Sequence, residues 1–108
     1  MAKSLDQLQK EIDELLQGYS KPYWAPLSIL ARLMEEVGEV ARILNHDYGD
    51  KPKKPNEAPD DLEDELADVL WTLICLANSE GVSLEKGIKR SVDKLTVRDK
   101  DLFPKKSQ

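Results

Sequence analysis

Two pairs of carboxylates stand out in the sequence, because each pair is spaced three residues apart within an otherwise apolar segment. Glu36 and Glu39 form the first pair, and Glu65 and Asp68 form the second. Residues three apart lie on one face of an α-helix, so each segment would present two carboxylates about one turn apart. Carboxylates that face one another repel, and burying an ionised carboxylate without a partner costs several kcal/mol. Either a cation lies between these acids or they face water, and their apolar surroundings favour the cation.

The ligand set indicates which cation would bind. All four side chains offer oxygen, and the one histidine of the chain, His46, lies seven residues after Glu39. The Glu-x-x-His motif of di-iron helical bundles is therefore missing from both pairs. An all-oxygen set favours a hard ion, so we expect Mg²⁺, with Mn²⁺ as a substitute. Because Mg²⁺ in proteins usually binds together with substrate phosphates, the site predicts a polyanionic ligand.

The elements that position these acids are predicted to be helices. Apolar residues recur at the helical period in four segments, and glycine and proline separate them. Ser4 is a suitable N-cap for the first helix, and Gly81 is suited to end the third. The whole chain, residues 1–108, is therefore expected to form a single all-α domain, a four-helix bundle. The expected helices span residues 5–17, 27–46 or 27–47, 60–79 or 61–79, and 83–98.

Three connecting or terminal segments carry open alternatives. The segment of residues 19–26 holds three of the six aromatic residues, so it forms either a hydrophobic plug or a platform for a flat ring. The Pro- and Lys-rich segment of residues 50–59 is expected to be a solvated connector, with a lid that meets phosphate as the alternative. The tail of residues 99–108 is expected to be flexible, with anchoring by Leu102 and Phe103 as the alternative.

The second and third predicted helices are apolar on most sides. A surface helix has one apolar stripe, so these two helices need more cover than two amphipathic partners provide. A homo-oligomer is the simplest way to supply that cover. On the fourth predicted helix, Lys94 and Arg98 belong to a basic series that is either a solvated face or a set of phosphate contacts.

Composition excludes several classes of protein. The formal charge is −5, so binding to a nucleic-acid backbone is not expected. An apolar run of about 20 residues, which crossing a membrane requires, is missing. The single cysteine, Cys75, cannot form an internal disulfide and is expected to be a buried apolar residue. The first residues show no secretory signal, so a cytoplasmic protein is expected.

The order of the acidic motifs resembles a known family. Glu35-Glu36-Val37-Gly38-Glu39 fits EExxE, and Glu65-Leu66-Ala67-Asp68 fits ExxD after a gap of 25 residues. Trp24-Ala25-Pro26-Leu27 and a basic ending from Lys94 to Arg98 extend the similarity over about residues 20 to 100. The chain thus resembles the MazG-like nucleoside triphosphate pyrophosphohydrolases, in particular the small single-domain bacterial members.

This resemblance implies an all-α fold that assembles as a homodimer or a dimer of dimers. It also implies hydrolysis of a nucleoside or deoxynucleoside triphosphate to the monophosphate and pyrophosphate with Mg²⁺, with house-cleaning of non-canonical nucleotides as one role. The alternatives are a non-catalytic nucleotide- or metal-binding dimerisation module and a helical adaptor with exposed acids. By motif position, Glu36, Glu39, Glu65 and Asp68 would bind the metal, and Glu35 would orient or deprotonate the attacking water. The secondary candidates, which the motif itself does not assign, are Trp24 or Trp71 for base stacking and Asn78, Lys94 and Arg98 for other substrate contacts.

Overall fold

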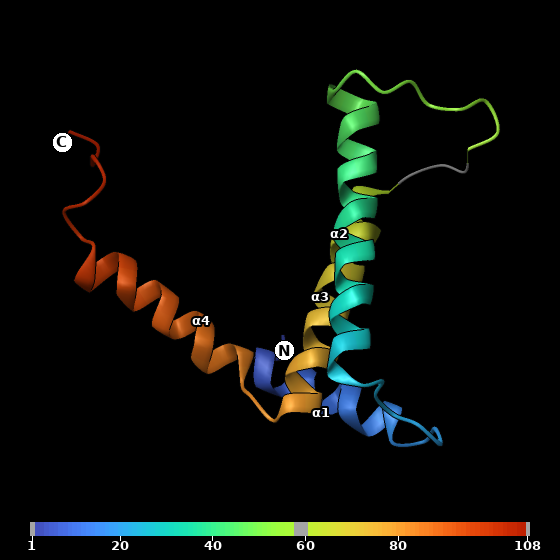
Figure 1. Cartoon of the computed structure of the whole chain (residues 1–108). Helices are drawn as coiled ribbons and strands as arrows, with labels where there is room; N and C mark the ends of the chain where they lie inside the picture. Colours follow the sequence, from blue (N-terminus) through green and yellow to red (C-terminus); the bar gives the residue numbers. More distant parts are fainter. Residues whose placement is uncertain (1, 58–60, 108) are drawn as a thin grey trace.

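The computed structural model describes residues 2–57 and 61–107, and it is all-helical over these residues (Figure 1). The prediction of an all-α protein is therefore confirmed for the described part of the chain. Pro59 and Asp60, which belong to the predicted loop and to one possible start of the third helix, lie outside it. The helices are α1 (Leu5–Leu16), α2 (Pro26–Tyr48), α3 (Leu62–Glu80), α4 (Leu84–Asp93) and the π-helical turn η1 (Lys94–Arg98).

Capping side chains fix where the helices begin. Ser4 and Gln7 form a reciprocal capping box at the start of α1, with N···O distances of 2.7 and 3.1 Å. The Asp61 carboxylate accepts a hydrogen bond from the Glu63 amide at 2.9 Å, and the Ser83 hydroxyl accepts one from the Lys86 amide at 3.1 Å. These contacts satisfy amides that have no partner within the helix, so local sequence sets the starts of α1, α3 and α4.

The fourth helix differs from the prediction of a single α-helix over residues 83–98. Its α-helical part ends at Asp93, and the next five residues form the π-helical turn, which closes with a 2.7 Å bond from the Asp99 amide to the Lys94 carbonyl. Within this turn the Thr96 hydroxyl donates to the Val92 carbonyl at 2.9 Å. A hydroxyl that bonds a carbonyl one turn back competes with the regular ladder and favours such a local widening.

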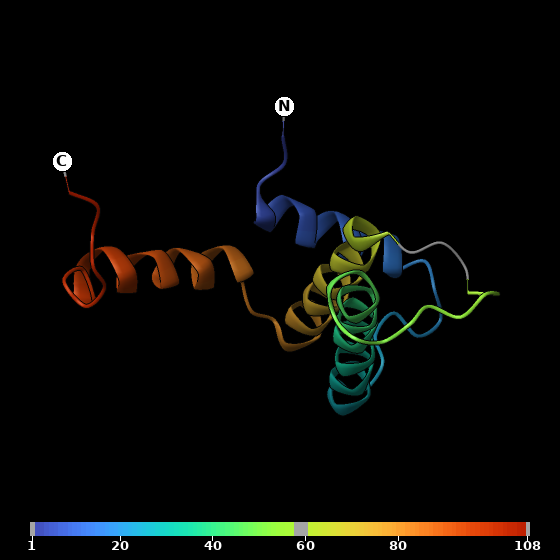
Figure 2. The ribbon, with the colours of Figure 1, turned by 90° about the horizontal axis from the view of Figure 1, so that it is seen from above.

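Helices α2 and α3 lie side by side in opposite directions, and α1 crosses them near the end where α3 finishes (Figures 1 and 2). Their contact follows from the apolar residues that both helices carry. The core between the three helices consists of Ile12, Ile29, Ile43, Ile74 and Ala77, all buried. This packing holds the acidic motifs of α2 and α3 at a fixed separation.

A buried polar contact joins α1, the end of α3 and the start of α4. The Gln9 side-chain amide donates to the Asn78 side-chain oxygen and to the Val82 carbonyl, both at 3.0 Å. Its oxygen accepts from the Leu84 amide at 2.8 Å, and the Asn78 side-chain amide donates to the Gln9 carbonyl at 3.0 Å. Gln9 is only 7% exposed, so these bonds satisfy a side chain that water cannot reach freely.

The four predicted α-helices are present among the described residues, but α4 projects away from α2 and α3, so the helices do not close into a bundle within one chain (Figures 1 and 2). Helix α4 contacts α1 and then extends away from the other helices. The radius of gyration is 17.9 Å, whereas a compact chain of this length would have about 13 Å. The apolar stripe of α4 has little to pack on, because Ile88 and Val92 are more than half exposed.

Large apolar side chains also remain exposed on α2 and α3. Among them, Leu27 on α2 is 80% exposed and Leu66 on α3 is 51% exposed. None of the helices in residues 2–57 and 61–107 combines the length and the apolar composition that a bilayer span needs. The exposed faces are wide enough for a further layer of helices to pack against them.

Candidate active site

Three of the four predicted metal ligands converge between α2 and α3. One carboxylate oxygen from each of Glu36, Glu65 and Asp68 lies within 4.8 Å of the other two. Glu36 comes from α2, and the other two come from consecutive turns of α3. Mg²⁺ binds oxygen ligands at 2.0–2.1 Å, so opposite ligands lie about 4.2 Å apart, close to the observed spacing. Both the donor chemistry and the separation therefore fit a divalent cation.

The fourth predicted ligand, Glu39, lines a cavity together with these three carboxylates, but its own carboxylate is turned toward Arg42. Its carboxylate accepts a hydrogen bond from Arg42 Nε at 3.0 Å and forms an ion pair with Arg42 Nη2 at 2.9 Å. Glu35, the predicted water-orienting residue, also lines this cavity of about 460 Å³. We call it the acidic cavity, and its walls are formed by Arg32, Glu35, Glu36, Glu39, Glu65 and Asp68.

The charges in the acidic cavity are only partly compensated. Partial desolvation raises the pKa of Glu65, and the neighbouring carboxylates of Asp68, Glu39 and Glu36 raise it further. Glu36 is 6% exposed and is bonded to Arg32 Nη2 at 2.6 Å. Arg32 Nη1 also contacts Glu35 at 3.1 Å. Like charges at this spacing favour the entry of a cation, which would lower their mutual repulsion.

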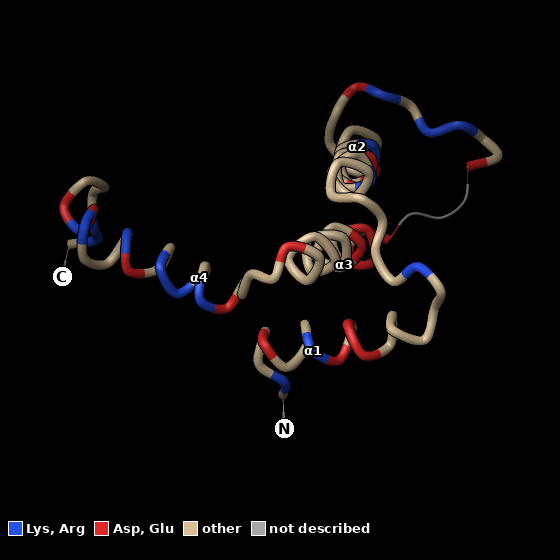
Figure 3. The backbone as a smooth tube through the Cα atoms, turned by 60° about the horizontal axis from the view of Figure 1, so that its bottom comes forward, with Lys and Arg blue, Asp and Glu red and all other residues tan. Residues whose placement is uncertain are grey.

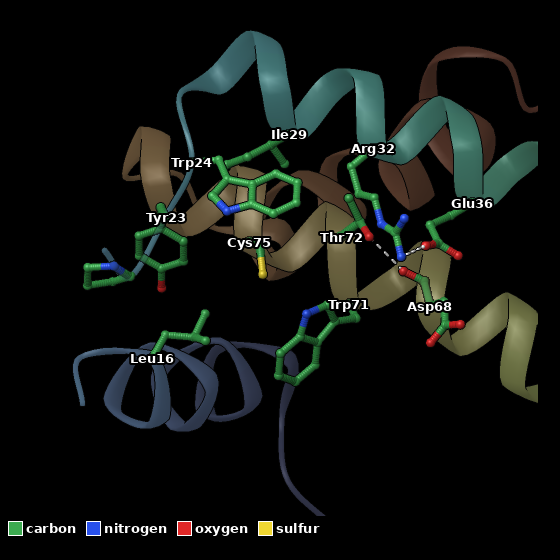
Figure 4. Close-up of a pocket in the computed structure, with 11 residues that line it drawn as sticks. Leu16, Tyr23, Trp24, Ile29, Arg32, Glu36, Asp68, Trp71, Thr72 and Cys75 are labelled. Atoms are coloured by element: carbon green, nitrogen blue, oxygen red, sulfur yellow. Dashed lines mark hydrogen bonds and ion pairs between the residues drawn. The ribbon is translucent and has the colours of Figure 1, made fainter. Parts of the chain in front are cut away.

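A second cavity of about 450 Å³ opens beside the first (Figure 4). We call it the aromatic cavity. Trp24 reaches it from the connector before α2 and Trp71 from α3, so the connector does not merely plug the end of the helices. The Cys75 side chain, which is half-buried, points into the space near the two indole rings. The remaining lining residues are Leu16, Pro22, Tyr23, Ile29, Arg32, Glu36, Asp68 and Thr72.

Two groups in the aromatic cavity stay neutral at ordinary pH. Burial, together with the hydrogen bond and the charge of Asp13, raises the pKa of Tyr23 to about 12. That hydrogen bond runs from the Tyr23 hydroxyl to the Asp13 carboxylate at 2.5 Å. Burial also raises the pKa of the Cys75 thiol. The part of the cavity between the two indole rings is lined by neutral groups, and it suits a flat heterocycle better than an ion.

The two cavities share part of their walls. Arg32, Glu36 and Asp68 line both of them. The Asp68 backbone is also fixed from the aromatic side, because the Thr72 hydroxyl donates to its carbonyl at 2.9 Å. A ligand with an aromatic group at one end and an anionic, metal-binding group at the other could therefore occupy both cavities at once.

The other predicted substrate contacts lie outside the two cavities. Asn78 is engaged with Gln9 through both ends of its side-chain amide. Lys94 and Arg98 lie on the projecting η1 turn, and Figure 3 shows the basic residues spaced along this arm, away from the acids of α2 and α3. Arg98 bonds its neighbour Asp99 at 2.9 and 2.7 Å. Within one chain the structure does not bring Lys94 and Arg98 to the acidic cavity.

The described part of the loop of residues 50–59 is tied back to the end of α2. His46 Nδ1 lies 3.2 Å from the Lys51 carbonyl oxygen, and His46 Nε2 lies 3.0 Å from the Glu57 carboxylate. The His46 side chain is 2% exposed, so it belongs to this contact and not to the acidic cavity. Between the two ends the loop extends away from the helices (Figure 1).

Sequence reasoning missed Arg32, which borders both cavities. The available signal was its position three residues before Glu35 and four before Glu36, which brings a guanidinium next to both carboxylates on one helix face. Tyr23 was also missed. Its place in the aromatic cavity depends on how the connector folds over α1, which no residue spacing shows.

Comparison with known proteins identifies the family. Residues 25–103 match the model of the MazG nucleotide pyrophosphohydrolase domain. The chain belongs to the MazG family. The match includes both acidic motifs and the whole of α4 and η1, and it begins one residue after Trp24. The resemblance that the motifs indicated is confirmed, and MazG membership indicates a hydrolase of the nucleotide pyrophosphohydrolase class.

Two similar proteins match most of this chain. The uncharacterized protein YpjD of Bacillus subtilis (strain 168) is 43% identical over 106 residues, which span 98% of this chain and 96% of YpjD. The uncharacterized protein YvdC of the same organism is 36% identical over 89 residues, which span 74% of this chain and 84% of YvdC.

Two crystal structures share the fold. One is that of YpjD from Bacillus subtilis, described provisionally as a pyrophosphatase, with a TM-score of 0.80 and 42% identity over 90% of this chain and 99% of that one. The other is the Bacillus-conserved MazG protein, a nucleotide pyrophosphohydrolase, with a TM-score of 0.76 and 40% identity over 93% of this chain and 97% of that one.

Proposed function

We propose that this protein is a Mg²⁺-dependent nucleoside triphosphate pyrophosphohydrolase. It would convert a nucleoside or deoxynucleoside triphosphate and water into the monophosphate and pyrophosphate. The observation that carries this proposal is the shared wall of the two cavities, formed by Arg32, Glu36 and Asp68. A base in the aromatic cavity would thereby place its phosphates at the acids, and membership of the MazG family supports the same reaction.

The predicted residues that line the two cavities have roles that their positions support. Trp24 and Trp71 would flank the base, while Glu36, Glu65 and Asp68 would hold the ion, joined by Glu39 if Arg42 releases it. When bound, Mg²⁺ supplies charge stabilisation on the phosphate oxygens and acidifies water.

Glu35 remains the candidate general base. Its carboxylate is exposed in the acidic cavity and is held by Arg32 at 3.1 Å, so it can accept a proton from water there. The water oxygen would form a bond to the α-phosphorus while the bond from that phosphorus to the bridging oxygen breaks. Pyrophosphate would then leave with the electron pair of that broken bond.

We also propose that the protein is a homo-oligomer, a dimer or a dimer of dimers. The exposed apolar faces of α2 and α3 and the unpacked stripe of α4 support this. Lys94 and Arg98 lie too far along α4 and η1 to serve the acids of their own chain, so their predicted phosphate contacts would require a second copy. Light scattering of the purified chain measures the assembly, and a monomer at micromolar concentration would contradict it.

A product assay tests the proposed reaction. Canonical and modified nucleoside triphosphates are incubated with Mg²⁺ or Mn²⁺, and pyrophosphate and orthophosphate are measured separately. Pyrophosphate as the first product is expected, with no turnover by Glu36→Gln or Asp68→Asn. Orthophosphate as the first product would exclude cleavage between the α- and β-phosphates. Nucleotide binding without any product would instead identify a non-catalytic binding module.

A further inference from the structure

Arg32 lies at the junction of the aromatic and acidic cavities. Its guanidinium is bonded to Glu36 at 2.6 Å (Figure 4) and to Glu35 at 3.1 Å. Its side chain lines both cavities. We propose that Arg32 occupies the place of the cation in the empty protein and binds the substrate phosphates once a divalent ion has displaced it from Glu36. This inference rests on the proposed function and assigns a phosphate-binding residue to that site.

The displacement follows from competition for one carboxylate. Glu36 is the α2 member of the three-carboxylate cluster and also the closest partner of Arg32. A divalent ion that binds Glu36 brings two positive charges close to the guanidinium and weakens its bond to that carboxylate. The Arg32 side chain is half exposed, whereas the Glu36 side chain is 7% exposed, so the arginine is the partner that can move.

The position of Arg32 explains why it would bind phosphate after it leaves Glu36. A nucleotide that spans both cavities has its phosphates between the base and the metal-binding acids, and this is where the two cavities share the Arg32 wall. A guanidinium presents two parallel N–H donors that match two phosphate oxygens. Glu35 can retain one edge of the guanidinium and limit how far it turns away.

Arg42 provides a matched control on the same helix. It bonds Glu39, a predicted ligand, three residues before it, much as Arg32 bonds Glu35 and Glu36. Arg42 differs in one respect that matters here, because it is not among the residues that line either cavity. Both arginines can compete with a metal ion for a carboxylate, but only Arg32 borders the place of the phosphates.

The experiment uses calorimetry on the full chain and requires no turnover. Mn²⁺ is titrated into the wild type, Arg32→Met and Arg42→Met, and circular dichroism confirms that each variant is folded. The α,β-methylene analogues of ATP, GTP, CTP and UTP, which cannot be cleaved between those phosphates, are then titrated at saturating Mn²⁺. The affinity for the analogue that the wild type binds most tightly is then compared across the variants. Arg32→Lys is added because it keeps the positive charge but removes the two parallel N–H donors of the guanidinium.

Arg32→Met and Arg42→Met should have different effects on the affinity for the nucleotide analogue. Arg32→Met should raise the affinity for Mn²⁺ about fivefold, the effect of removing one half-exposed ion pair. It should also lower the affinity for the analogue about tenfold, the effect of losing a charged hydrogen bond, and Arg32→Lys should recover only part of it. Arg42→Met should leave the analogue affinity within about twofold of wild type, the small effect expected of a pair outside the cavities.

Opposite results identify which idea fails. Equal analogue affinity in the wild type and Arg32→Met would overturn the phosphate role while leaving the proposed function intact. A lower Mn²⁺ affinity in Arg32→Met would overturn the displacement. If the wild type binds none of the four analogues in Mn²⁺, the proposed function fails, and the role of Arg32 fails with it.

Discussion

The substitution Glu36→Gln tests the metal site with little change in shape. In the empty protein it removes the 2.6 Å ion pair with Arg32, which contributes about 1 kcal/mol because Arg32 is half exposed. It also removes repulsion from Glu65 and Asp68, whose oxygens lie within 4.8 Å. The relief of two repulsions opposes the loss of one ion pair, so the free energy of unfolding should change by no more than about 1 kcal/mol.

The effect on metal binding should be much larger. The amide that Glu36→Gln introduces is neutral, and removing one of three ligand charges should weaken Mn²⁺ binding about 100-fold. At a Mn²⁺ concentration of about 100 times the wild-type dissociation constant, binding stabilises the wild type by about 2.7 kcal/mol and the variant by about 0.4 kcal/mol. A chain of this size gains about 4 °C or more in Tm per kcal/mol, so the expected shifts are about 10 °C and about 2 °C.

The assay is thermal unfolding with and without Mn²⁺, after the wild-type dissociation constant has been measured by calorimetry. Glu35→Gln is the matched control, since Glu35 is the adjacent residue, lines the same cavity and lies outside the three-carboxylate cluster. It should keep the full metal-dependent shift. If Glu36→Gln also keeps the full shift, the cluster is not the metal site. If Glu35→Gln loses it, the separation of ligand and base is wrong.

Three further substitutions probe the electrostatics and the packing around the site. Glu65→Gln should stabilise the metal-free protein at neutral pH, because the raised pKa of Glu65 means that its ionised form disfavours the fold. This stabilisation should disappear below pH 4.5, where Glu65 is protonated in both the folded and the unfolded protein. Thermal melts in EDTA at neutral pH and below pH 4.5 test this. Tyr23→Phe should cost about 1 kcal/mol by removing the bond to Asp13. The raised pKa of Tyr23 stabilises the wild type below pH 10, and this contribution is lost as the pH approaches 12, so urea melts should show a shallower decline in that range for the variant. Gln9→Met should cost about 3 kcal/mol in urea melts, since three buried side-chain hydrogen bonds disappear, and a loss below about 1 kcal/mol would contradict their importance.

The helices could be predicted from sequence because local chemistry fixes them. Ser4, Asp61 and Ser83 cap their helices, and Gly81 ends α3 with φ at 68°, a conformation that favours glycine. The place of α4 could not be predicted in this way. Its apolar stripe shows that it needs a partner, but the partner surface is not encoded in the period of the stripe. Within the chain, α1 holds only the start of α4, where Gln9 accepts a hydrogen bond from the Leu84 amide and Asp6 accepts one from the Ser83 hydroxyl.

The sequence predicted that the clustered carboxylates need compensation, but the sequence argument considered only two sources of it, a metal ion or water. The structure shows a third, since Arg32 and Arg42 each neutralise a carboxylate from within the same helix. This explains why Glu39 stands apart from the other three predicted ligands. A guanidinium three or four residues away along a helix competes directly for a carboxylate, and helical spacing alone does not reveal which partner it takes.

The charge balance of the site also limits how it can accept a triphosphate. The five carboxylates and the two arginines leave three negative charges, which one divalent ion cannot fully compensate. A triphosphate adds about four more at neutral pH, and unpaired charges in a partly buried site are costly. Under the proposed function, further positive charge would come from additional ions, from the lysines of the loop after α2, or from Lys94 and Arg98 of a second copy. The Mn²⁺ stoichiometry, measured with and without the analogue, distinguishes these sources, because only additional ions raise it when the analogue binds.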